Sequence, residues 1–455
     1  MKNVLKTRVW VPVLALPMLF LAACQPVSKN TGDNTRHYAV DPALTNNVPF
    51  RDFTINAEEG DTLQLAEGTN IFIPKGIFVD RNGDPVKGDI SLHYRAFYTA
   101  GELIASGITM FYDTAGEKSV FSSAGEFEIN GEQDGSPVSI APGKNITMDF
   151  ASSNDSTFNF YSLDTANSKW NYEYQTTAQP NVVRAKLEKV LAGVFSRPIE
   201  PQKFDPVKPV INFDVNIDDH PELKGYAGIM WQYAGSGNDP EQNKWIYDED
   251  WKNAKLSLAD TNTCKYDLDL SDNTRHFTTQ VVPSVRAGDY DAAIKKYKED
   301  LLTFEADERD RQVKRKDLAL TQHFQRTLSI NSLGFYNCDN RMIAALRRWV
   351  RAKFRFTSST FQNDQNNVGV FVVTNNGQVV SAYNAGENPE IFYIDKTITK
   401  IIAVHRGTND VEVMDGSTFD SYAKNDKDAL IEFGLRSAPN KVVDSHDMDL
   451  LIANL

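Results

Sequence analysis

Histidine and carboxylate side chains carry most acid–base and metal chemistry, and in this sequence they form no known catalytic motif. The seven histidines are scattered, with no two at the spacing of a metal-binding pair. There is no zinc-protease HExxH, GxSxG turn, P-loop, or strand followed by GxGxxG. His220-Pro221-Glu222 matches the HxE of zinc deaminases, but no PCxxC follows to complete the ligands. We therefore expect no enzyme, no metal and no cofactor, and rank a hydrolase site assembled from distant residues last.

Large aromatic residues concentrate between positions 231 and 251, where they would suit sugar binding. Flat rings stack on sugar faces, and the candidate platform is Trp231, Trp245, Tyr247 and Trp251. Trp245 and Trp251 lie in the polar stretch NKWIYDEDW, so we expect these two rings to be exposed. The alternative is that the rings fill a hydrophobic core, where each would bury about 150–250 Å².

A basic stripe is expected on the segment RRWVRAKFRF at 347–356. In a strand, Arg351, Lys353 and Arg355 lie on one face because side chains alternate. The chain has a net charge of −13, so this face would suit an anionic partner, whereas general nucleic-acid binding is not expected. The alternative is that the stripe pairs with carboxylates of a neighbouring strand of the same chain.

The three cysteines and the acidic turns leave further questions open. Cys264 and Cys338 can form one disulfide between two domains, or they can remain as two separately buried thiols. The turn DRNGD at 80–84 offers oxygens at alternate positions, as calcium loops do. Its glycine is fourth rather than sixth, so a hairpin turn is the simpler interpretation.

The first 24 residues indicate export. Three basic residues precede an apolar stretch at 9–23, which is short and contains two prolines, so a signal peptide is favoured over a membrane-spanning helix. The stretch ends in LAAC, which resembles the lipobox of bacterial lipoproteins. The resemblance implies cleavage before Cys24 and acylation of that cysteine, which would anchor the chain stably to a membrane. We expect an outer-membrane location and leave the choice of surface or periplasmic face open.

The remaining sequence predicts a mainly β protein. Apolar residues make up 41% and charged residues 24%, as in globular proteins, and 455 residues suggest about three domains. Short alternating runs separated by turns indicate three β-sandwich (Ig-like) domains in tandem, with one long helix between the second and third. The expected parts are a signal peptide at 1–23, a lipidated cysteine and flexible tether at 24–47, sandwiches at 48–175, 207–286 and 321–455, a connector at 176–206 and a helical strut at 287–320.

Two helices are expected at the ends of the second domain. Val183, Leu187 and Val190 have helical spacing in the connector. The strut carries an apolar stripe that starts at Tyr290 and stops at Phe304, after which charged residues dominate. Asp289 is expected to cap its N-terminus.

Two stretches add a resemblance. EGTNIFIPKGIFVDRNGDPVKGDISLHYRAF at 67–97 and FSSAGEFEI at 121–129 are similar to the start of ZU5-like and carboxypeptidase-regulatory-like β-sandwiches. With the lipobox and LGFYNCD at 333–339, the whole chain resembles uncharacterised envelope lipoproteins of Bacteroidota. The resemblance implies a non-catalytic sandwich and assigns no functional residues. We expect a lipid-anchored, non-enzymatic binding or scaffolding module that takes a glycan or an envelope protein as its partner. The alternative is a structural partner in an outer-membrane or periplasmic assembly.

Overall fold

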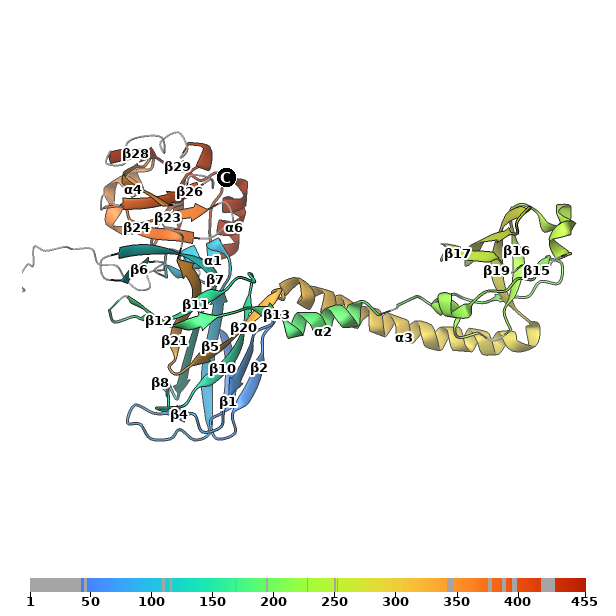
Figure 1. The fold of residues 1–455 in the computed structure, drawn as a ribbon, viewed down its shortest axis with the longest axis horizontal. Coiled ribbons are helices and arrows are strands. Elements are labelled where there is room, and N and C mark those ends of the chain that lie inside the picture. The colour runs from blue at the N-terminus through green and yellow to red at the C-terminus, as the bar shows by residue number, and fades with distance from the viewer. Residues whose placement is uncertain are drawn as a thin grey trace, which may run out of the picture. The chain divides into compact units, whose positions relative to one another are not determined.

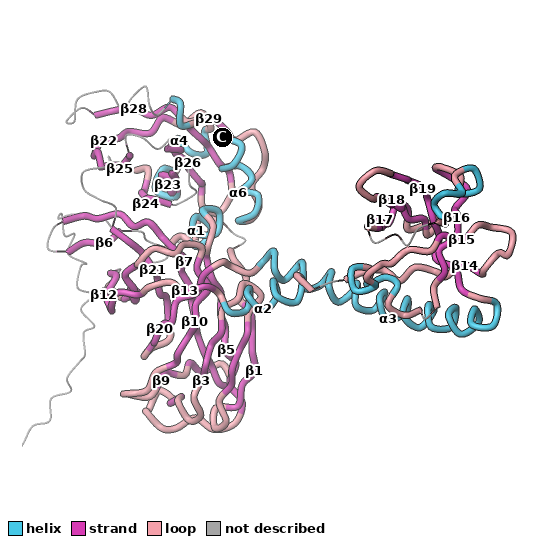
Figure 2. Tube along the Cα trace, turned by 45° about the vertical axis from the view of Figure 1, so that its right-hand side comes forward, coloured by secondary structure: helices cyan, strands magenta, loops and turns pink. Residues whose placement is uncertain are grey.

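The structure, a computed structural model, describes residues 42–44, 47–108, 111–114, 117–167, 169–193, 195–226, 228–248, 251, 253–341, 347–374, 379–386, 390–394, 399–418 and 430–455. It is mainly β, with several sheets whose strands are almost all antiparallel, and this confirms the predicted class (Figure 2). The signal peptide and Cys24 lie outside the described residues. Three tandem Ig-like sandwiches are not what the described strands form.

The first unit is a two-sheet sandwich, called the N-terminal sandwich below. Its larger sheet has the order β1-β5-β7-β21-β11-β12, with β6 and β8 also paired to β7. These strands are β1 Arg51–Asn56, β5 Asp89–Phe97, β6 Phe111–Thr114, β7 Glu117–Gln133, β8 Ser136–Pro137, β11 Phe158–Asp164, β12 Lys169–Thr176 and β21 Gly334–Arg341. The facing sheet has the order β13-β20-β10-β3-β2, with β2 Asp61–Gln64, β3 Asn70–Ile73, β10 Ile146–Ser152, β13 Gln179–Pro180 and β20 Phe324–Ile330. A short ribbon of β4 Phe78–Val79 and β9 Ser139–Ile140 completes the unit.

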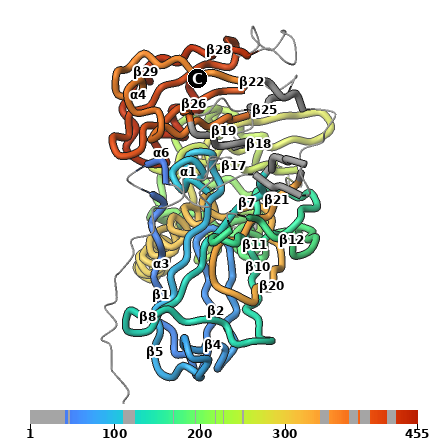
Figure 3. The backbone as a smooth tube through the Cα atoms, turned by 90° about the vertical axis from the view of Figure 1, so that its left-hand side faces the viewer, coloured from blue at the N-terminus to red at the C-terminus, as the bar shows by residue number. Residues whose placement is uncertain are grey.

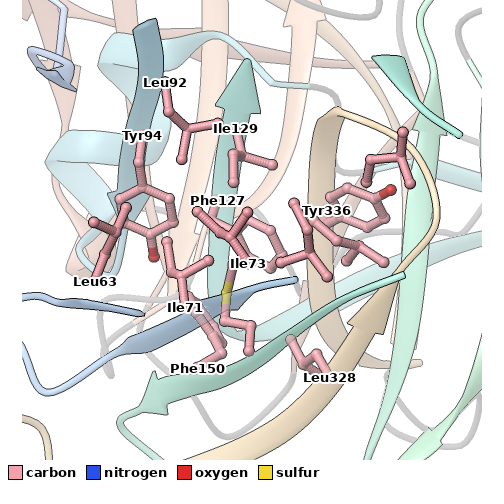
Figure 4. Packing of buried hydrophobic residues seen from close by; sticks show 14 of the residues in the cluster. Leu63, Ile71, Ile73, Leu92, Tyr94, Phe127, Ile129, Phe150, Leu328 and Tyr336 are labelled. Atoms are coloured by element: carbon pink, nitrogen blue, oxygen red, sulfur yellow. The ribbon is translucent and has the colours of Figure 1, made fainter. Parts of the chain in front are cut away.

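The core of the N-terminal sandwich lies between these two sheets. Alternation places Tyr94, Phe127 and Ile129 of the larger sheet opposite Ile71 and Phe150 of the smaller one (Figure 4). All five side chains are fully buried. The predicted period-two pattern therefore identifies the core face of these strands.

The N-terminal sandwich is discontinuous in sequence, which differs from the predicted boundaries. Strands β20 and β21 were expected to begin the third domain, but β20 pairs with β10 and β21 lies between β7 and β11. In Figure 1 they appear in orange-brown among blue and green strands, and Figure 3 places β20 beside β10 in the same way. Leu328, Ile330 and Tyr336 belong to the core of this sandwich. The segment 48–175 is therefore not a complete domain.

Arg326 secures the late strand β20 to the early part of the sandwich. Its side chain is fully buried and carries no carboxylate hydrogen bond, because its guanidinium donates to Ser152 Oγ and to the carbonyl oxygens of Asn154, Ser156 and Thr176. Burial lowers the pKa of this guanidinium from its usual value. The four acceptors lie in and after β10 and at the end of β12, so Arg326 joins segments that are remote in sequence.

Residues 182–320, called the insert below, leave and re-enter the sandwich at neighbouring points. Strands β13 and β20 are antiparallel neighbours, and the Asn181 N–H donates to the carbonyl of His323 at 3.0 Å. The Asn181 side chain also donates to the carbonyl of Gly68, and the Thr321 hydroxyl donates to that of Ala66. The insert thus occupies the position of a hairpin loop between β13 and β20.

Two helices form the base of the insert. α2 Val182–Leu191 confirms the expected connector helix and is capped by the Asn181 side chain. α3 Ala287–Leu320 has 34 residues and is therefore about 50 Å long. It begins after Arg286, so Asp289 lies in its first turn and the expected cap is wrong. Arg311 donates to the carbonyls of Val190 and Leu191, and neither helix has a buried residue.

Between the helices lies one small sheet, called the module below (residues 199–286). Its order is β15-β16-β19-β18-β17, and β14 pairs in parallel with β19. The strands are β14 Gln202–Lys203, β15 Val210–Ile211, β16 Met230–Gly237, β17 Ala254–Asp260, β18 Lys265–Ser271 and β19 His276–Val285. Short 3₁₀ turns at Ile217–Asp219, Pro221–Leu223, Pro240–Gln242 and Lys244–Tyr247 help to cover one face. The expected second sandwich is therefore a single sheet covered by its own loops.

The third unit, the C-terminal sandwich, begins after β21. A sheet of β25 Glu390–Ile394, β22 Arg347–Arg355 and β28 Leu430–Gly434 faces a sheet of β24 Val379–Asn384, β23 Val368–Thr374, β26 Thr399–His405, β27 Asp410–Met414 and β29 Arg436–Ser437. The helices are α4 Ser359–Asn363, a 3₁₀ turn at Gln365–Asn367 and α6 Ser445–Asn454. Strand β23 is buried along its whole length because its second face meets the N-terminal sandwich.

The two sandwiches share a hydrophobic cluster. Phe371 and Val404 of the C-terminal sandwich belong to the same buried cluster as Tyr161 and Trp170 of the N-terminal one. Helix α1 Ala100–Ser106 packs closely against α6, and the Gly101 N–H donates to Asp449 Oδ1 at 2.7 Å. Ala43 and Leu44 are also buried in this cluster, so any free tether ends before the predicted residue 47.

Candidate functional site

One face of the module's sheet is open and polar. A shallow hollow of about 530 Å³ lies on it over β16, β17, β18 and β19. The side chains that line the hollow come mainly from serine, threonine, aspartate, glutamine and lysine: Ser236, Lys255, Ser257, Asp267, Asp269, Thr278, Thr279 and Gln280. We call this surface the polar face, and it is the candidate binding site.

Cross-strand hydrogen bonds order the polar face. The Ser236 hydroxyl donates to Gln280 Oε1, and Gln280 Nε2 donates to Asp267 Oδ1 at 2.8 Å. Asp269 pairs with His276 across the neighbouring strand at 2.7 Å. The side chains are therefore held in fixed positions before any ligand arrives, which lowers the entropic cost of binding.

The local sequence explains why these side chains face outward. In β18, Tyr266, Leu268 and Leu270 are buried while Asp267 and Asp269 point to the other face. Between Tyr233 and Gly237 the register of β16 against β19 is irregular. Gly237 has a φ of +84°, and a Cβ there would lie 2.9 Å from the Cα of Thr279, so the hollow depends on a glycine at this close approach.

The aromatic platform predicted from the sequence is not a surface. Trp231 is 5% exposed and Trp251 is 3% exposed, and both belong to the module's core on the side opposite the polar face. The Trp251 ring N–H donates to the carbonyl of Ile246, which anchors the ring inside. Trp245 packs edge-on against Trp251 at 5.8 Å and is half-buried, so only Tyr247, 42% exposed, is presented to solvent. Trp231 and Trp251 therefore fill the core of the module, as the alternative interpretation of the sequence expected.

A second hollow of about 360 Å³ lies between α3 and the loops that enter the module. Phe195 stacks on Phe304 at 4.5 Å on its apolar side, and Glu222 lies on its polar side. Tyr266 donates to Glu222 Oε1 at 3.0 Å, and His220 Nδ1 lies 3.3 Å from the same oxygen. His220 and Glu222 are therefore neighbours, but their partner is a tyrosine rather than further metal ligands. Burial and the Glu222 carboxylate raise the pKa of Tyr266.

The basic stripe of β22 is partly neutralised within the chain. Arg351, Lys353 and Arg355 are exposed on one face, as predicted. The parallel neighbour β28 places Glu432 opposite Lys353, and its carboxylate lies 3.7 Å from Lys353 and 3.1 Å from Arg355. Such exposed pairs contribute little to stability but reduce the net charge of the stripe.

The two cysteines of the folded part are free and buried, so of the two alternatives that the sequence leaves open, two separate thiols are observed and the candidate disulfide is not. Cys338 belongs to the core of the N-terminal sandwich and Cys264 to that of the module. Burial raises the pKa of both thiols, which keeps them protonated and unreactive. The predicted lipid-attachment residue Cys24 lies outside the described residues.

One histidine has a hydroxyl and a carboxylate beside it, as in a hydrolase triad. His405 Nδ1 lies 3.2 Å from Thr408 Oγ1, and Nε2 lies 3.4 Å from Asp364 Oδ2. The Thr408 hydroxyl donates to Asp410, so its oxygen can only accept from His405. An imidazole that donates to the hydroxyl cannot remove its proton. These residues stabilise the turn between β26 and β27.

The turn at 80–84 is closed by its own hydrogen bonds. Asp80 Oδ1 accepts from the N–H groups of Asn82 and Asp84, and Gly83 has a φ of +88°. This agrees with the hairpin interpretation. Among the described residues, no group of three or more His, Cys, Asp or Glu side chains is arranged to hold a metal ion.

Comparison with protein families, with curated proteins and with solved structures finds no match to this chain. Within the described residues, no helix is both long and apolar enough to span a membrane. The polar face was missed by the sequence reasoning, although its signal was present. The runs at 255–258 and 265–270 each alternate polar and apolar residues, and only their pairing with each other and with 276–280 brings the polar side chains together.

Proposed function

We propose that this chain is a lipid-anchored cell-envelope protein that binds a ligand through the polar face of its module and has no catalytic role. The observation that carries the proposal is that the module completes its core with its own residues and leaves the other face of its sheet open. All members of its hydrophobic cluster lie between residues 199 and 281. None of the other three clusters includes a residue of the insert.

The position of the insert supports a separate role for the module. Insertion at a hairpin tip adds a unit without changing the core that surrounds it. The long helix α3 contributes no buried residue, so its length and charged surface suit presentation of the module rather than packing. Such an arrangement suits a display element more than a catalytic domain, whose site needs a closed pocket.

The chemistry of the polar face favours a hydroxyl-rich ligand. Carboxylate, amide, hydroxyl and ammonium groups lie side by side on the hollow, at Asp267, Gln280, Ser257 and Lys255. These groups form hydrogen bonds to sugar hydroxyls without a stacked ring. We therefore retain the glycan expectation but move it from the aromatic cluster to the opposite face of the same sheet.

The test uses the full chain and two variants in a glycan binding screen. Asp267→Ala combined with Lys255→Ala removes groups that line the hollow and leaves the module core intact. Lys244→Ala is the matched control, because Lys244 is exposed on a 3₁₀ turn of the same module and does not line the hollow. We expect at least a tenfold loss of affinity in the double variant and none in the control. Equal binding by all three proteins contradicts the assignment of the polar face.

A second candidate is a structural role in an envelope assembly. The observation that favours it is a set of exposed apolar side chains on the two helices of the insert: Val182, Val190, Leu302, Val313 and Leu320. An assembly through these helices would resist salt, whereas one through the basic stripe of β22 would not. Co-purification of an envelope protein that survives high salt and is lost in Leu302→Glu with Val313→Glu supports the helices.

The anchor is tested separately from the ligand. Labelling of cells with an alkyne fatty acid should mark the chain, and Cys24→Ala should abolish the label. Protease treatment of intact cells then distinguishes surface exposure from the periplasm. If the chain is not labelled by the fatty acid, the lipid anchor is wrong, but the proposal that the polar face binds a ligand is not affected.

A further inference from the structure

Two acidic side chains are buried together in the larger sheet of the N-terminal sandwich. Glu126 of β7 and Asp339 of β21 both have no exposed surface. They lie on the face of the sheet opposite the core that contains Phe127 and Tyr336. Neither takes part in any ion pair among the described residues.

The strand register brings four oxygen-bearing side chains together. Asn337 lies directly opposite Glu126, and Asp339 lies opposite Ser123. The Ser123 hydroxyl donates to Asn337 Oδ1 at 3.2 Å, and Asn337 Nδ2 donates to Asp339 Oδ2. On this face, side chains of directly opposite and diagonal positions are close enough to share one ligand.

Three carboxylate oxygens in this cluster have no partner. Both oxygens of Glu126 and Oδ1 of Asp339 are buried without a hydrogen bond. Buried polar atoms are almost always satisfied, and two buried carboxylates with three unsatisfied oxygens between them carry a large desolvation cost. Burial raises the pKa of both groups, and repulsion from Asp339 adds to the rise at Glu126. When both carboxylates are ionised, a cation between them would balance their charge.

We infer that Glu126, Asp339, Asn337 and Ser123 form a binding site for a divalent cation, with calcium as the preferred ion. Two carboxylates match a charge of +2. All four side chains offer oxygen, the atom that calcium prefers, and the two free oxygens of Glu126 allow the bidentate contact that calcium accepts and magnesium rarely uses.

The site would join the two halves of the discontinuous sandwich. Glu126 comes before the insert and Asp339 after it, so a shared cation links strands that are more than 200 residues apart in sequence, as the 3.2 Å contact from Ser123 to Asn337 already does. The inference is independent of the ligand proposed for the module. It concerns the assembly of the sandwich from its two segments.

The test is thermal unfolding of the full-length chain in detergent after treatment with EDTA. Calcium chloride is added to one sample, magnesium chloride to a second and sodium chloride at equal ionic strength to a third. A ligand that binds only the native state raises the melting temperature, so we expect an increase of several degrees with calcium and a smaller one with magnesium. Elemental analysis of the dialysed protein should find about one calcium per chain.

The variants are Glu126→Gln and Asp339→Asn, and the control is Glu132→Gln, on the same strand but only partly buried. We expect the calcium shift to vanish in the first two and persist in the control. No calcium shift in the parent chain, or an equal shift in all proteins, overturns the inference.

A readout that does not depend on the variants is luminescence of bound terbium, an oxygen-binding substitute for calcium. Tyr161 lies opposite Asn337 on the neighbouring strand and is close enough to sensitise the ion. Added calcium should displace terbium and remove the luminescence, with about one bound ion per chain. Absence of sensitised emission from the folded parent chain means that the pair shares a proton instead, and the cation site is wrong.

Discussion

Removal of the insert is the sharpest test of the discontinuous sandwich. The change replaces residues 183–320 with Gly-Ser-Gly-Ser, which joins Val182 to Thr321. The 3.0 Å hydrogen bond from Asn181 to His323 holds the two ends together. Four residues span up to about 13 Å, enough to close the hairpin between β13 and β20.

The expected cost is small because no core is opened. The insert contributes no residue to the clusters of the two sandwiches. The side-chain hydrogen bonds lost at the junction include that from Arg184 to the carbonyl of Thr321, at 2.8 Å, and those from the N–H groups of Val183 and Arg184 to Asn181 Oδ1. Each such bond is worth about 1 kcal/mol, so the free energy of unfolding should change by no more than about 3 kcal/mol.

The fragment 42–181 is the contrasting protein, since it contains all of the predicted first domain, 48–175. It lacks β20 and β21 and therefore loses the buried side chains of Leu328, Ile330 and Tyr336. Burial of three large apolar side chains contributes roughly 5–9 kcal/mol. A typical domain has only about 5–15 kcal/mol of net stability, so the fragment should not fold.

The assay is urea unfolding followed by far-ultraviolet circular dichroism and tryptophan fluorescence. In the excised protein the described tryptophans that remain are Trp170 and Trp349, because the other three lie in the insert. A cooperative transition for the fragment 42–181, or an unfolded excised protein, would refute the discontinuous assignment. The excised protein also serves the functional test, since it should lose binding through the polar face while remaining folded.

Three further predictions concern single positions. A Cβ on Gly101 would lie 2.1 Å from a carbonyl oxygen at the start of α6, so Gly101→Val should cost about 2–4 kcal/mol in urea unfolding, whereas Gly193→Val, which has room, should cost little. Arg326→Met removes the donor to three carbonyl oxygens, that of Thr176 buried and those of Asn154 and Ser156 partly so, and should cost about 3–5 kcal/mol, with faster hydrogen exchange in β20. Cys264 and Cys338 should resist alkylation in the native protein and both react after unfolding without reductant; a thiol that stays unlabelled would indicate a disulfide.

Much of the fold class was predictable because its signals are local. The alternation of Ile90, Leu92 and Tyr94 marks the core face of β5, and all three are buried. The helical spacing from Tyr290 to Phe304 and the charged run that follows predict α3, and its observed bounds are those expected for the strut. Boundaries between domains were not predictable from such patterns, because β20 and β21 look the same whether they start a third sandwich or complete the first one.

In the candidate site, too, local features were predictable and long-range packing was not. The outward direction of Asp267 and Asp269 follows from period two, but which face of the module is open depends on where its loops pack. Trp251 stands in a polar stretch, and only the hydrogen bond of its ring to Ile246 inside the core explains its burial. The pairing of Glu126 with Asp339 cannot be predicted from the local sequence, because each residue alone fits the pattern of an ordinary polar position on a strand.

By itself, the sequence determined most of the strands, the long helix and the faces of the strands, because these depend on neighbours within a few residues; the export signal that we expect at its start stays a prediction. The tertiary structure decided which strands share a sheet, that residues 182–320 interrupt a domain, which aromatic rings are buried and which carboxylates meet. Most of these properties arise from contacts between segments more than 100 residues apart, such as that of Ser329 with Thr147. The burial of Trp231 and Trp251 arises from packing within the module, and no alternation pattern along the chain encodes it.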